Sequence, residues 1–242
     1  IGIVANISSI LAKHNCNIVE SKQFTDQENG HFFIRQSFTL LNDEILNKLQ
    51  DDLLILSKDL SAELFLTDIQ SSMNTIMLVS KFDHCLNDLL YRVRNNSLNL
   101  NIKAIISNHM IAEEIANFSN IPFYYLPIDK SNKEEQELKI KNLIIENDVE
   151  MIVLARYMQV LSEELANQFE GKIINIHHSF LPSFKGAKPY HQAFERGVKV
   201  IGATAHYVTS DLDEGPIIEQ DTQEVDHEMM PNNLVSMGRD IE

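Results

Sequence analysis

Short strands that are apolar along their whole length recur from about residue 75 onward, and helix-like segments separate them. We expect four such strands at 75–80, 102–107, 151–155 and 172–176. A strand that is apolar on both faces must be covered on both sides, and helical connections join strands in parallel. Residues 74–242 are therefore predicted to form a Rossmann-like α/β domain with a mainly parallel sheet. Active sites of such sheets lie beyond the carboxyl ends of the strands, so we expect chemistry in the loops that follow these four strands.

The first 70 residues show a different rhythm, that of an α+β unit. The apolar spacing predicts helices at 2–14 and 43–57 and strands at 17–25, 31–40 and 61–69. The dipeptide Asn29-Gly30 is a hairpin signal between the first two strands. One further strand in front would complete a ferredoxin-like βαββαβ unit. We expect that this first strand is missing, because the sequence begins within a helix, and that the last residues belong to no concluding element. Residues 70–74 are the predicted junction between domains 1–70 and 74–242.

Charge and cysteine content exclude several classes of protein. The net charge of −15 disfavours binding to nucleic acid or to an anionic membrane. No apolar run approaches the roughly 18 residues that a membrane span needs. Cys16 and Cys85 lie far apart without the spacing of a zinc site, so a structural disulfide or a cysteine-bound metal is not expected. These observations predict a cytoplasmic protein.

Two groups of polar residues are candidates for chemistry. Asn175 and His177 stand at the end of the strand at 172–176 and, being two residues apart, point to the same face. His178 points to the other face and is expected to pack. The turn at 210–216 carries Asp213, and an acidic turn of this kind is compatible either with a solvated loop or with a site.

The order of these groups resembles a known family. Asn-x-His-x-Ser-x-Leu-Pro at 175–182, followed by Leu-Asp-x-Gly-Pro at 212–216, is similar to the signature of the folate-dependent formyltransferases. The segments 177–182, 186–190 and 201–209 are more similar still to formyltetrahydrofolate deformylases. Segments 2–5, 15–18 and 32–35 resemble an ACT domain, a small regulatory module that often binds amino acids.

The resemblance implies a function and a site. The expected reaction is hydrolysis of 10-formyltetrahydrofolate to formate and tetrahydrofolate, with no metal and no cofactor. Asn175 and a protonated His177 would stabilise the oxyanion, while Asp213, if burial raises its pKa, would move the proton. The residues expected to bind the substrate are Arg156, Tyr157, Met158, Gln159, Val160, Leu161 and Gly186.

Alternatives remain open at this point. A related transferase cradles a phosphorylated amine with a glycine-rich loop, whereas residues 80–84 contain no glycine and include Asp83, which favours water as the acceptor. A formyltransferase acting on an aminoacyl-tRNA or an amino sugar, and a non-catalytic amino-acid sensor, are the competitors. The ACT-like module would bind an effector such as methionine or glycine, or serve only in oligomerisation; we expect a homo-oligomer. The released formate would supply purine synthesis and balance one-carbon pools.

Overall fold

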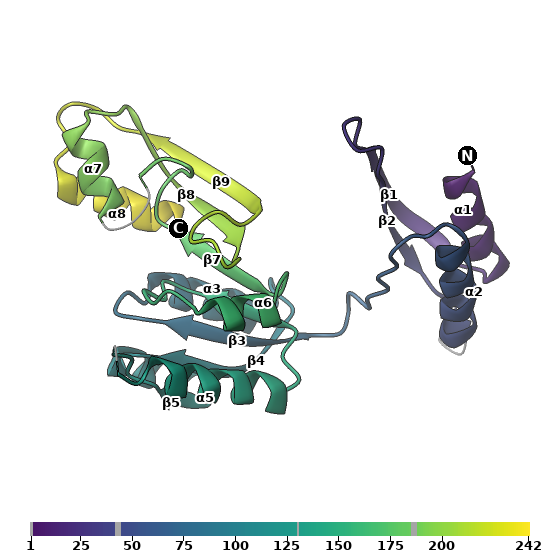
Figure 1. The fold of residues 1–242 in the computed structure, drawn as a ribbon, viewed down its shortest axis with the longest axis horizontal. Coiled ribbons are helices and arrows are strands. Elements are labelled where there is room, and N and C mark those ends of the chain that lie inside the picture. The colour runs from purple at the N-terminus through teal and green to yellow at the C-terminus, as the bar shows by residue number, and fades with distance from the viewer. Residues whose placement is uncertain (1, 42–44, 130, 185–187) are drawn as a thin grey trace. The chain divides into compact units, whose positions relative to one another are not determined.

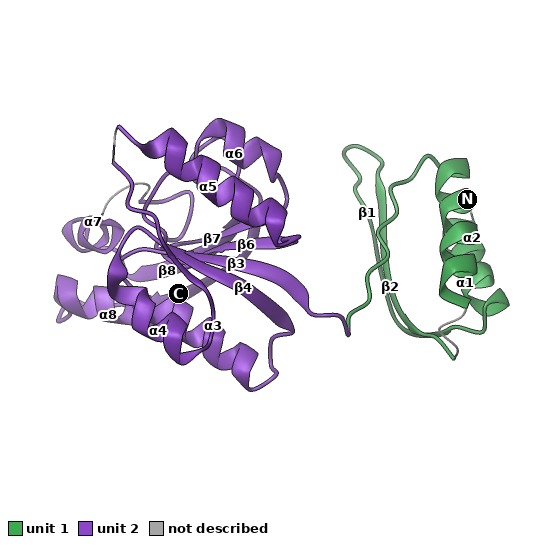
Figure 2. Ribbon diagram, turned by 90° about the horizontal axis from the view of Figure 1, so that it is seen from below, with its two compact units in different colours: residues 1–69 green, residues 70–242 purple. Residues whose placement is uncertain are grey.

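The computed structural model describes residues 2–41, 45–129, 131–184 and 188–242. The chain divides into two compact units, residues 1–69 and residues 70–242 (Figure 2). In the described residues no helix combines the length and the apolar character that a membrane crossing requires.

Unit 1 is built from two helices and one hairpin. Its elements are α1 (Ile3–Lys13), β1 (Asn17–Thr25), β2 (Phe32–Thr39) and α2 (Leu46–Asp59). β1 and β2 pair antiparallel across a turn in which Gly30 has a φ of 74°, a left-handed conformation that glycine adopts without strain. Leu11 from α1 packs with Leu49 and Leu53 from α2 to form a small core. Residues 42–44, where the predicted second helix begins, lie outside the described residues.

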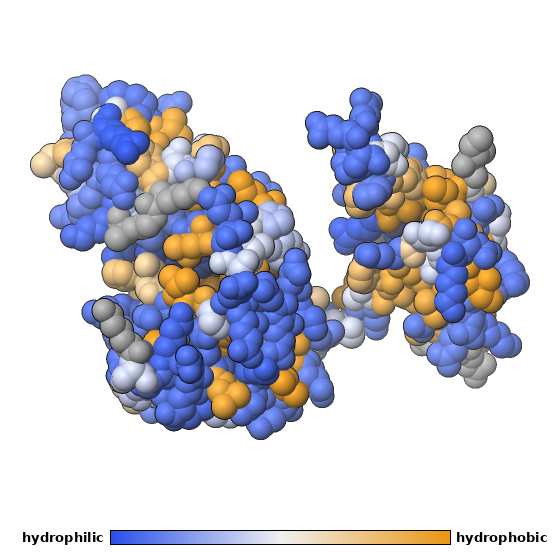
Figure 3. Space-filling model, in the orientation of Figure 1, coloured by the Kyte–Doolittle hydropathy of each residue, from blue (hydrophilic) through white to orange (hydrophobic). Residues whose placement is uncertain are grey.

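The strand predicted at 61–69 is wrong. The described strands do not include these residues. A strand forms by pairing within a sheet, and the described sheet of unit 1 consists of β1 and β2. Large apolar side chains stay exposed in this unit, among them Val19, Phe24, Phe33 and Phe65. Figure 3 shows apolar surface on the face of unit 1 that is turned to the viewer.

Unit 2 is a seven-stranded sheet with helices on both faces (Figure 1). Its strands are β3 (Met73–Val79), β4 (Leu100–Ser107), β5 (Phe123–Tyr125), β6 (Met151–Leu154), β7 (Ile173–His177), β8 (Val200–Tyr207) and β9 (Ile217–Glu224). Its helices are α3 (His84–Arg94), the 3₁₀-helix η2 (Met110–Ala112), α4 (Glu113–Phe118), α5 (Lys133–Glu146), α6 (Glu163–Gln168), α7 (Pro189–Glu195) and α8 (Pro231–Ile241).

The strand order is β5-β4-β3-β6-β7-β8-β9, and all neighbours from β5 to β7 are parallel. β8 and β9 are antiparallel additions at one side. The prediction of a mainly parallel sheet is therefore confirmed. The segment between β4 and β5 begins with a 3₁₀ turn before α4, and α8 forms where no concluding element was expected.

The two faces of β3 explain why the sheet is covered on both sides. Ile76 and Leu78 pack into one core with α5 and α6, whereas Met77 and Val79 pack into a second core with α3 and α4. Alternate residues of a strand point to opposite faces, so a strand that is apolar throughout needs both layers. The helices supply matching stripes, as in α5, where Ile140 and Ile144 are four residues apart and both buried. Figure 2 shows α5 and α6 on one side and α3 and α4 on the other.

Candidate active site

The loops that follow three neighbouring strands are tied together by Ser80. This buried residue directly follows β3, and its hydroxyl donates to Oδ1 of Asn108, after β4, over 2.7 Å. The same oxygen accepts the backbone N–H of Met158, after β6, at 2.9 Å. The carboxyl ends of parallel strands meet at one edge of the sheet, and here the structure joins them at the position where the strand pattern predicted chemistry.

Asn175 lies opposite His206 where β7 pairs with β8. The Nδ2 atom of Asn175 is 3.1 Å from Nε2 of His206, and Nδ1 of His206 is 2.9 Å from the carbonyl oxygen of Tyr207. A carbonyl oxygen can only accept, so Nδ1 of His206 carries the proton and, in the neutral ring, Nε2 accepts from the amide of Asn175. His206 thereby fixes which way the amide of Asn175 points, and one of its two N–H groups is left for another acceptor.

His177 and Asp213 form a buried pair. The Nδ1 atom of His177 is 3.3 Å from Oδ1 of Asp213, and His206 Nε2 is 3.9 Å from the same oxygen. Asp213 has a φ of 58°, a left-handed conformation that aspartate tolerates better than most residues. The following turn lies very close to the end of β8. A side chain at Gly215 would therefore clash with the carbonyl oxygen of Tyr207.

The charges at the site differ from the expectation for Asp213. The hydrogen bond from His177 lowers the pKa of Asp213 and outweighs burial, which acts to raise it. The expected raised pKa is therefore wrong, and the carboxylate is ionised at neutral pH. Burial, reinforced by the positive charge of Arg156 and by His177, lowers the pKa of His178 to about 3. His178 is a neutral ring whose centroid lies 5.2 Å from that of His177 and 6.2 Å from that of Tyr190.

The loop at 156–161, predicted to bind the substrate, is divided between core and surface. Arg156 is buried with a φ of 64°, and Tyr157 packs into the core beneath the sheet. Met158 and Val160 are 50% and 55% exposed and offer apolar surface to a ligand. Leu161 packs partly on the same core as Tyr157. Gln159, between Met158 and Val160, is half-buried, and Gly186 lies outside the described residues.

Two positioning residues were not predicted from the sequence. Thr204 on β8 donates from Oγ1 to the carbonyl oxygen of Ser179 at 2.8 Å and accepts from the N–H of Leu181 at 3.0 Å. Gln220 on β9 donates to the carbonyl oxygen of Leu181 at 2.9 Å and to Thr204 at 3.0 Å. These bonds hold the loop that follows His177. The available signal was the polar pair Thr204 and His206 at alternate positions of a strand that is otherwise small and apolar.

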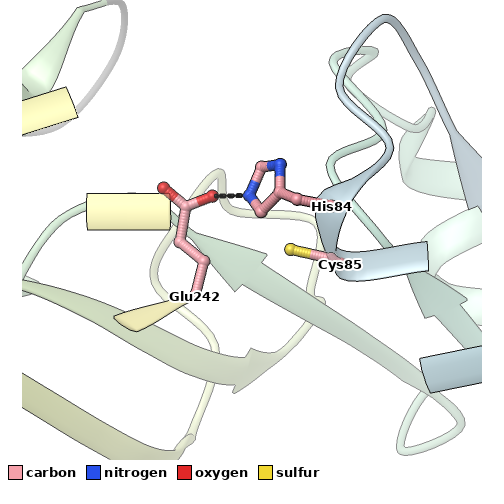
Figure 4. A group of neighbouring side chains, drawn as sticks. All are labelled: His84, Cys85 and Glu242. Carbon is pink, nitrogen blue, oxygen red and sulfur yellow. Dashed lines mark hydrogen bonds and ion pairs between the residues drawn. The ribbon is translucent and has the colours of Figure 1, made fainter. Parts of the chain in front are cut away.

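His84, Cys85 and Glu242 are the one group of described residues whose side chains are close enough to share a metal ion (Figure 4). Burial, followed by the charge of Glu242, raises the pKa of the Cys85 thiol to about 12, whereas a metal ligand must be a thiolate. Arg156 also places a positive charge 3.2 Å from Glu242, which a cation would have to oppose. The chemistry of these donors therefore does not favour a metal.

Comparisons with known proteins show the family of the chain. A family model described as formyl transferase matches residues 73–242. The formyltetrahydrofolate deformylase of Corynebacterium sp. (strain P-1) is 45% identical over 243 residues, which cover 100% of this chain and 85% of that protein. The crystal structure of a formyltetrahydrofolate deformylase from Pseudomonas syringae has a TM-score of 0.95 and 42% identity, covering 100% of this chain and 81% of that one.

A phosphoribosylglycinamide formyltransferase from Anaplasma phagocytophilum is also similar, with 33% identity and a TM-score of 0.63. The match covers 70% of this chain and 80% of that one. The deformylases match the whole chain, whereas the transferase matches only part of it. The family model covers more than half of the chain and the deformylases cover all of it, so the chain belongs to the formyltetrahydrofolate deformylase family.

Proposed function

We propose that this protein hydrolyses 10-formyltetrahydrofolate to formate and tetrahydrofolate, and that Asn175, His177 and Asp213 carry the reaction. The observation that supports these roles most directly is the state of His177. Its Nδ1 atom lies against Asp213, while its Nε2 atom is buried and has no hydrogen-bond partner among the described residues. A buried polar atom without a partner is costly, and a reacting oxygen would satisfy it.

Attack of water on the formyl carbon places negative charge on the formyl oxygen. Asn175 has one N–H engaged with His206 and a second one available for that oxygen. Nε2 of His177, when protonated, is the second donor. Donors that are already fixed in place stabilise the charge without reorganisation, and each such donor contributes about 2.7–4 kcal/mol to lowering the barrier.

The proton path runs through Asp213. As a carboxylate it accepts a proton from the attacking water while the new C–O bond forms. When the bond from carbon to N10 breaks, the same proton passes to N10, which leaves formate and tetrahydrofolate. The N–H of His177 holds the carboxylate in place through both steps.

The substrate would lie along residues 156–161 and against Gly186. Backbone groups of this loop pair with the edge of the pterin, and the exposed side chains of Met158 and Val160 offer apolar contact. Nη1 of Arg156 is buried and has no hydrogen-bond partner among the described residues, so it is available to a substrate oxygen.

Unit 1 would serve regulation. Its order of helix, two strands and helix supports an ACT-like module that binds an amino-acid effector and assembles the protein into a homo-oligomer. Methionine and glycine are the effectors to test, by isothermal titration calorimetry of the intact protein. The folate substrate and two free thiols are consistent with a cytoplasmic enzyme that supplies formate for purine synthesis.

The test mixes the full-length protein with 10-formyltetrahydrofolate and no amine, and follows formate and tetrahydrofolate together. We expect equal amounts of both products. Asp213→Asn keeps the shape of the side chain and removes the base, so kcat should fall by about 10²- to 10⁴-fold. Turnover that begins only when an amine is added would identify a transferase instead. The absence of turnover in both conditions would indicate a non-catalytic sensor. Membership of the deformylase family favours neither the transferase nor the sensor.

A further inference from the structure

A largely buried cluster lies beside the site, and apart from Arg156 its side chains have no role in the steps above. It consists of Phe82, His84, Arg156, Tyr190 and Glu242, which we call the Glu242 cluster. The carboxyl group of Glu242 is only 1% exposed. It accepts from Nε2 of His84 at 2.9 Å and from the hydroxyl of Tyr190 at 3.0 Å, and Nε of Arg156 lies 3.2 Å away.

The side chains of the cluster come from four segments that are separate in the sequence. His84 begins α3, Arg156 follows β6, Tyr190 belongs to α7, and Glu242 directly follows α8. Figure 4 shows the side chain of His84 reaching across to that of Glu242. Packing between α7 and α8 is tight, because any side chain at Gly238 would collide with the ring of Tyr190.

Phe82 forms the rim of the cluster. The guanidinium carbon of Arg156 lies 5.7 Å from the centre of its ring, and that of Arg239 lies 5.2 Å from it. Two cations over one aromatic ring hold it by cation–π attraction. The aromatic side chain of Phe82 thus helps to fix the loop after β3.

The cluster borders the catalytic pair through His178. The ring of His178 lies 5.2 Å from that of His177 on one side and 6.2 Å from that of Tyr190 on the other. Arg156 and Glu242 both act on His178 electrostatically. His178 therefore lies between the ring of His177 and that of Tyr190.

We infer that the Glu242 cluster occupies the place that an amine acceptor would need beside His177, and so reserves the formyl group for water. This inference rests on the proposed hydrolysis. The fold itself tolerates an amine, since the similar Anaplasma protein is named as a phosphoribosylglycinamide formyltransferase. Opening the cluster would strip a buried carboxylate of its partners, which is strongly unfavourable.

In an opened cluster the chemistry would change only in the nucleophile. The amine nitrogen bonds to the formyl carbon and loses a proton, the bond from carbon to N10 breaks, and N10 takes up that proton. The products are a formamide and tetrahydrofolate, and no other reactant is consumed. Asn175, His177 and Asp213 keep their roles.

The experiment measures how the formyl group is divided between water and glycinamide. Full-length protein receives 10-formyltetrahydrofolate at pH 8, where about half of an α-amino group is unprotonated. Formate and N-formylglycinamide are quantified by mass spectrometry. The opening variant is Phe82→Ala combined with His84→Ala. Its matched control, Phe82→Leu with His84→Gln, keeps most of the volume and a donor for Glu242.

We expect formate alone from the parent and the matched control. In the opening variant the ratio of N-formylglycinamide to formate should rise at least about tenfold, since small steric changes in a pocket alter relative rates by about 10- to 200-fold. An opening variant that still hydrolyses without forming the amide would overturn the inference alone, as would a parent that formylates glycinamide equally well. A parent that releases no formate would overturn the proposed function. If circular dichroism shows the double variant unfolded, Phe82→Ala alone takes its place under the same criteria.

Discussion

Each unit of this protein contains a buried histidine beside an aspartate, and only one of these pairs is placed for chemistry. In unit 1, Nε2 of His14 lies 2.7 Å from Oδ2 of Asp52, which Lys13 also approaches to 2.7 Å. In unit 2, Nδ1 of His177 lies 3.3 Å from Oδ1 of Asp213. The side chain of Asp52 is 27% exposed, whereas that of Asp213 is 9% exposed.

The difference lies in what surrounds each pair. Asp52 is shared between the ammonium group of Lys13 and the ring of His14 and joins α2 to the end of α1, so it acts as a structural tie. Asp213 faces a histidine whose second nitrogen has no partner among the described residues, beside the oriented amide of Asn175. A histidine–aspartate pair becomes reactive when one nitrogen is left free for a substrate in a place that excludes water.

The largest expected effect compares the two histidines. His177→Asn should lower kcat by about 10²- to 10⁴-fold, because the oxyanion loses a donor and Asp213 loses its partner. His14→Asn should leave kcat within about twofold, since its pair lies outside the catalytic unit, while lowering the melting temperature. Steady-state formate release measures both. Comparable losses of kcat would mean that the pair in unit 1 also serves the reaction.

Core truncation should separate the units next. Leu78→Ala and Leu49→Ala each remove a fully buried side chain and should cost about 2–5 kcal/mol. Unit 1 has a small core, so we expect Leu49→Ala to unfold it while unit 2 keeps its protection against hydrogen exchange. Hydrogen exchange followed by mass spectrometry distinguishes the two. Simultaneous loss of protection in both units would show that they unfold together.

Two glycines offer a smaller contrast. Gly238→Ala places a methyl group against the ring of Tyr190 and should cost about 1–3 kcal/mol through overpacking. Gly30→Ala meets open space but forces alanine into a left-handed turn, which should cost about 1–2 kcal/mol. Urea denaturation measures both. Pairing Gly238→Ala with Tyr190→Ala should recover stability only if the clash is the cause.

The smallest effect concerns pH and salt. Hydrogen bonds from His177 lower the pKa of Asp213, and those from Lys13 and His14 lower that of Asp52. Each stabilisation is present above the unfolded pKa of about 3.9 and is lost as the pH falls through the lower folded value. In 1 M salt, where the screening length is about 3 Å, the exposed pair should weaken more. The difference in melting temperature between the parent and Asp52→Asn should become smaller in 1 M salt. The difference between the parent and Asp213→Asn should stay the same. If both differences became smaller to the same extent, the contrast in burial would be contradicted.

Most of the sheet was predictable because its strands carry a local signal. Met77 and Leu78 lie in a run that is apolar throughout, and such a run is stable only between two layers of helices. The strand at 61–69 failed for the opposite reason. Its sequence does alternate between apolar and polar residues. A strand, however, forms only by pairing with another strand, and its own sequence does not specify that partner.

Some residues of the candidate site could likewise be predicted from the sequence, and others could not. Asn175, His177 and Asp213 were found from motif order, and the spacing of the first two is a property of any strand. The positions of Thr204, Gln220 and His206 as supports of the site could not be read from the sequence, because their roles depend on partners that lie far away along the chain.

The sequence by itself determined the alternation of apolar strands and helices, the family motifs and the residues able to do chemistry, since these depend on neighbours along the chain. Only the tertiary structure decided the charge of Asp213 and the closing of the Glu242 cluster. Expected burial suggested a raised pKa for Asp213, and the hydrogen bond from His177 reversed its direction. Likewise, His84 and Glu242 are 158 positions apart and bind each other only because the sheet brings α3 and α8 together. Electrostatic energies depend on distance in space, which the order of residues does not contain.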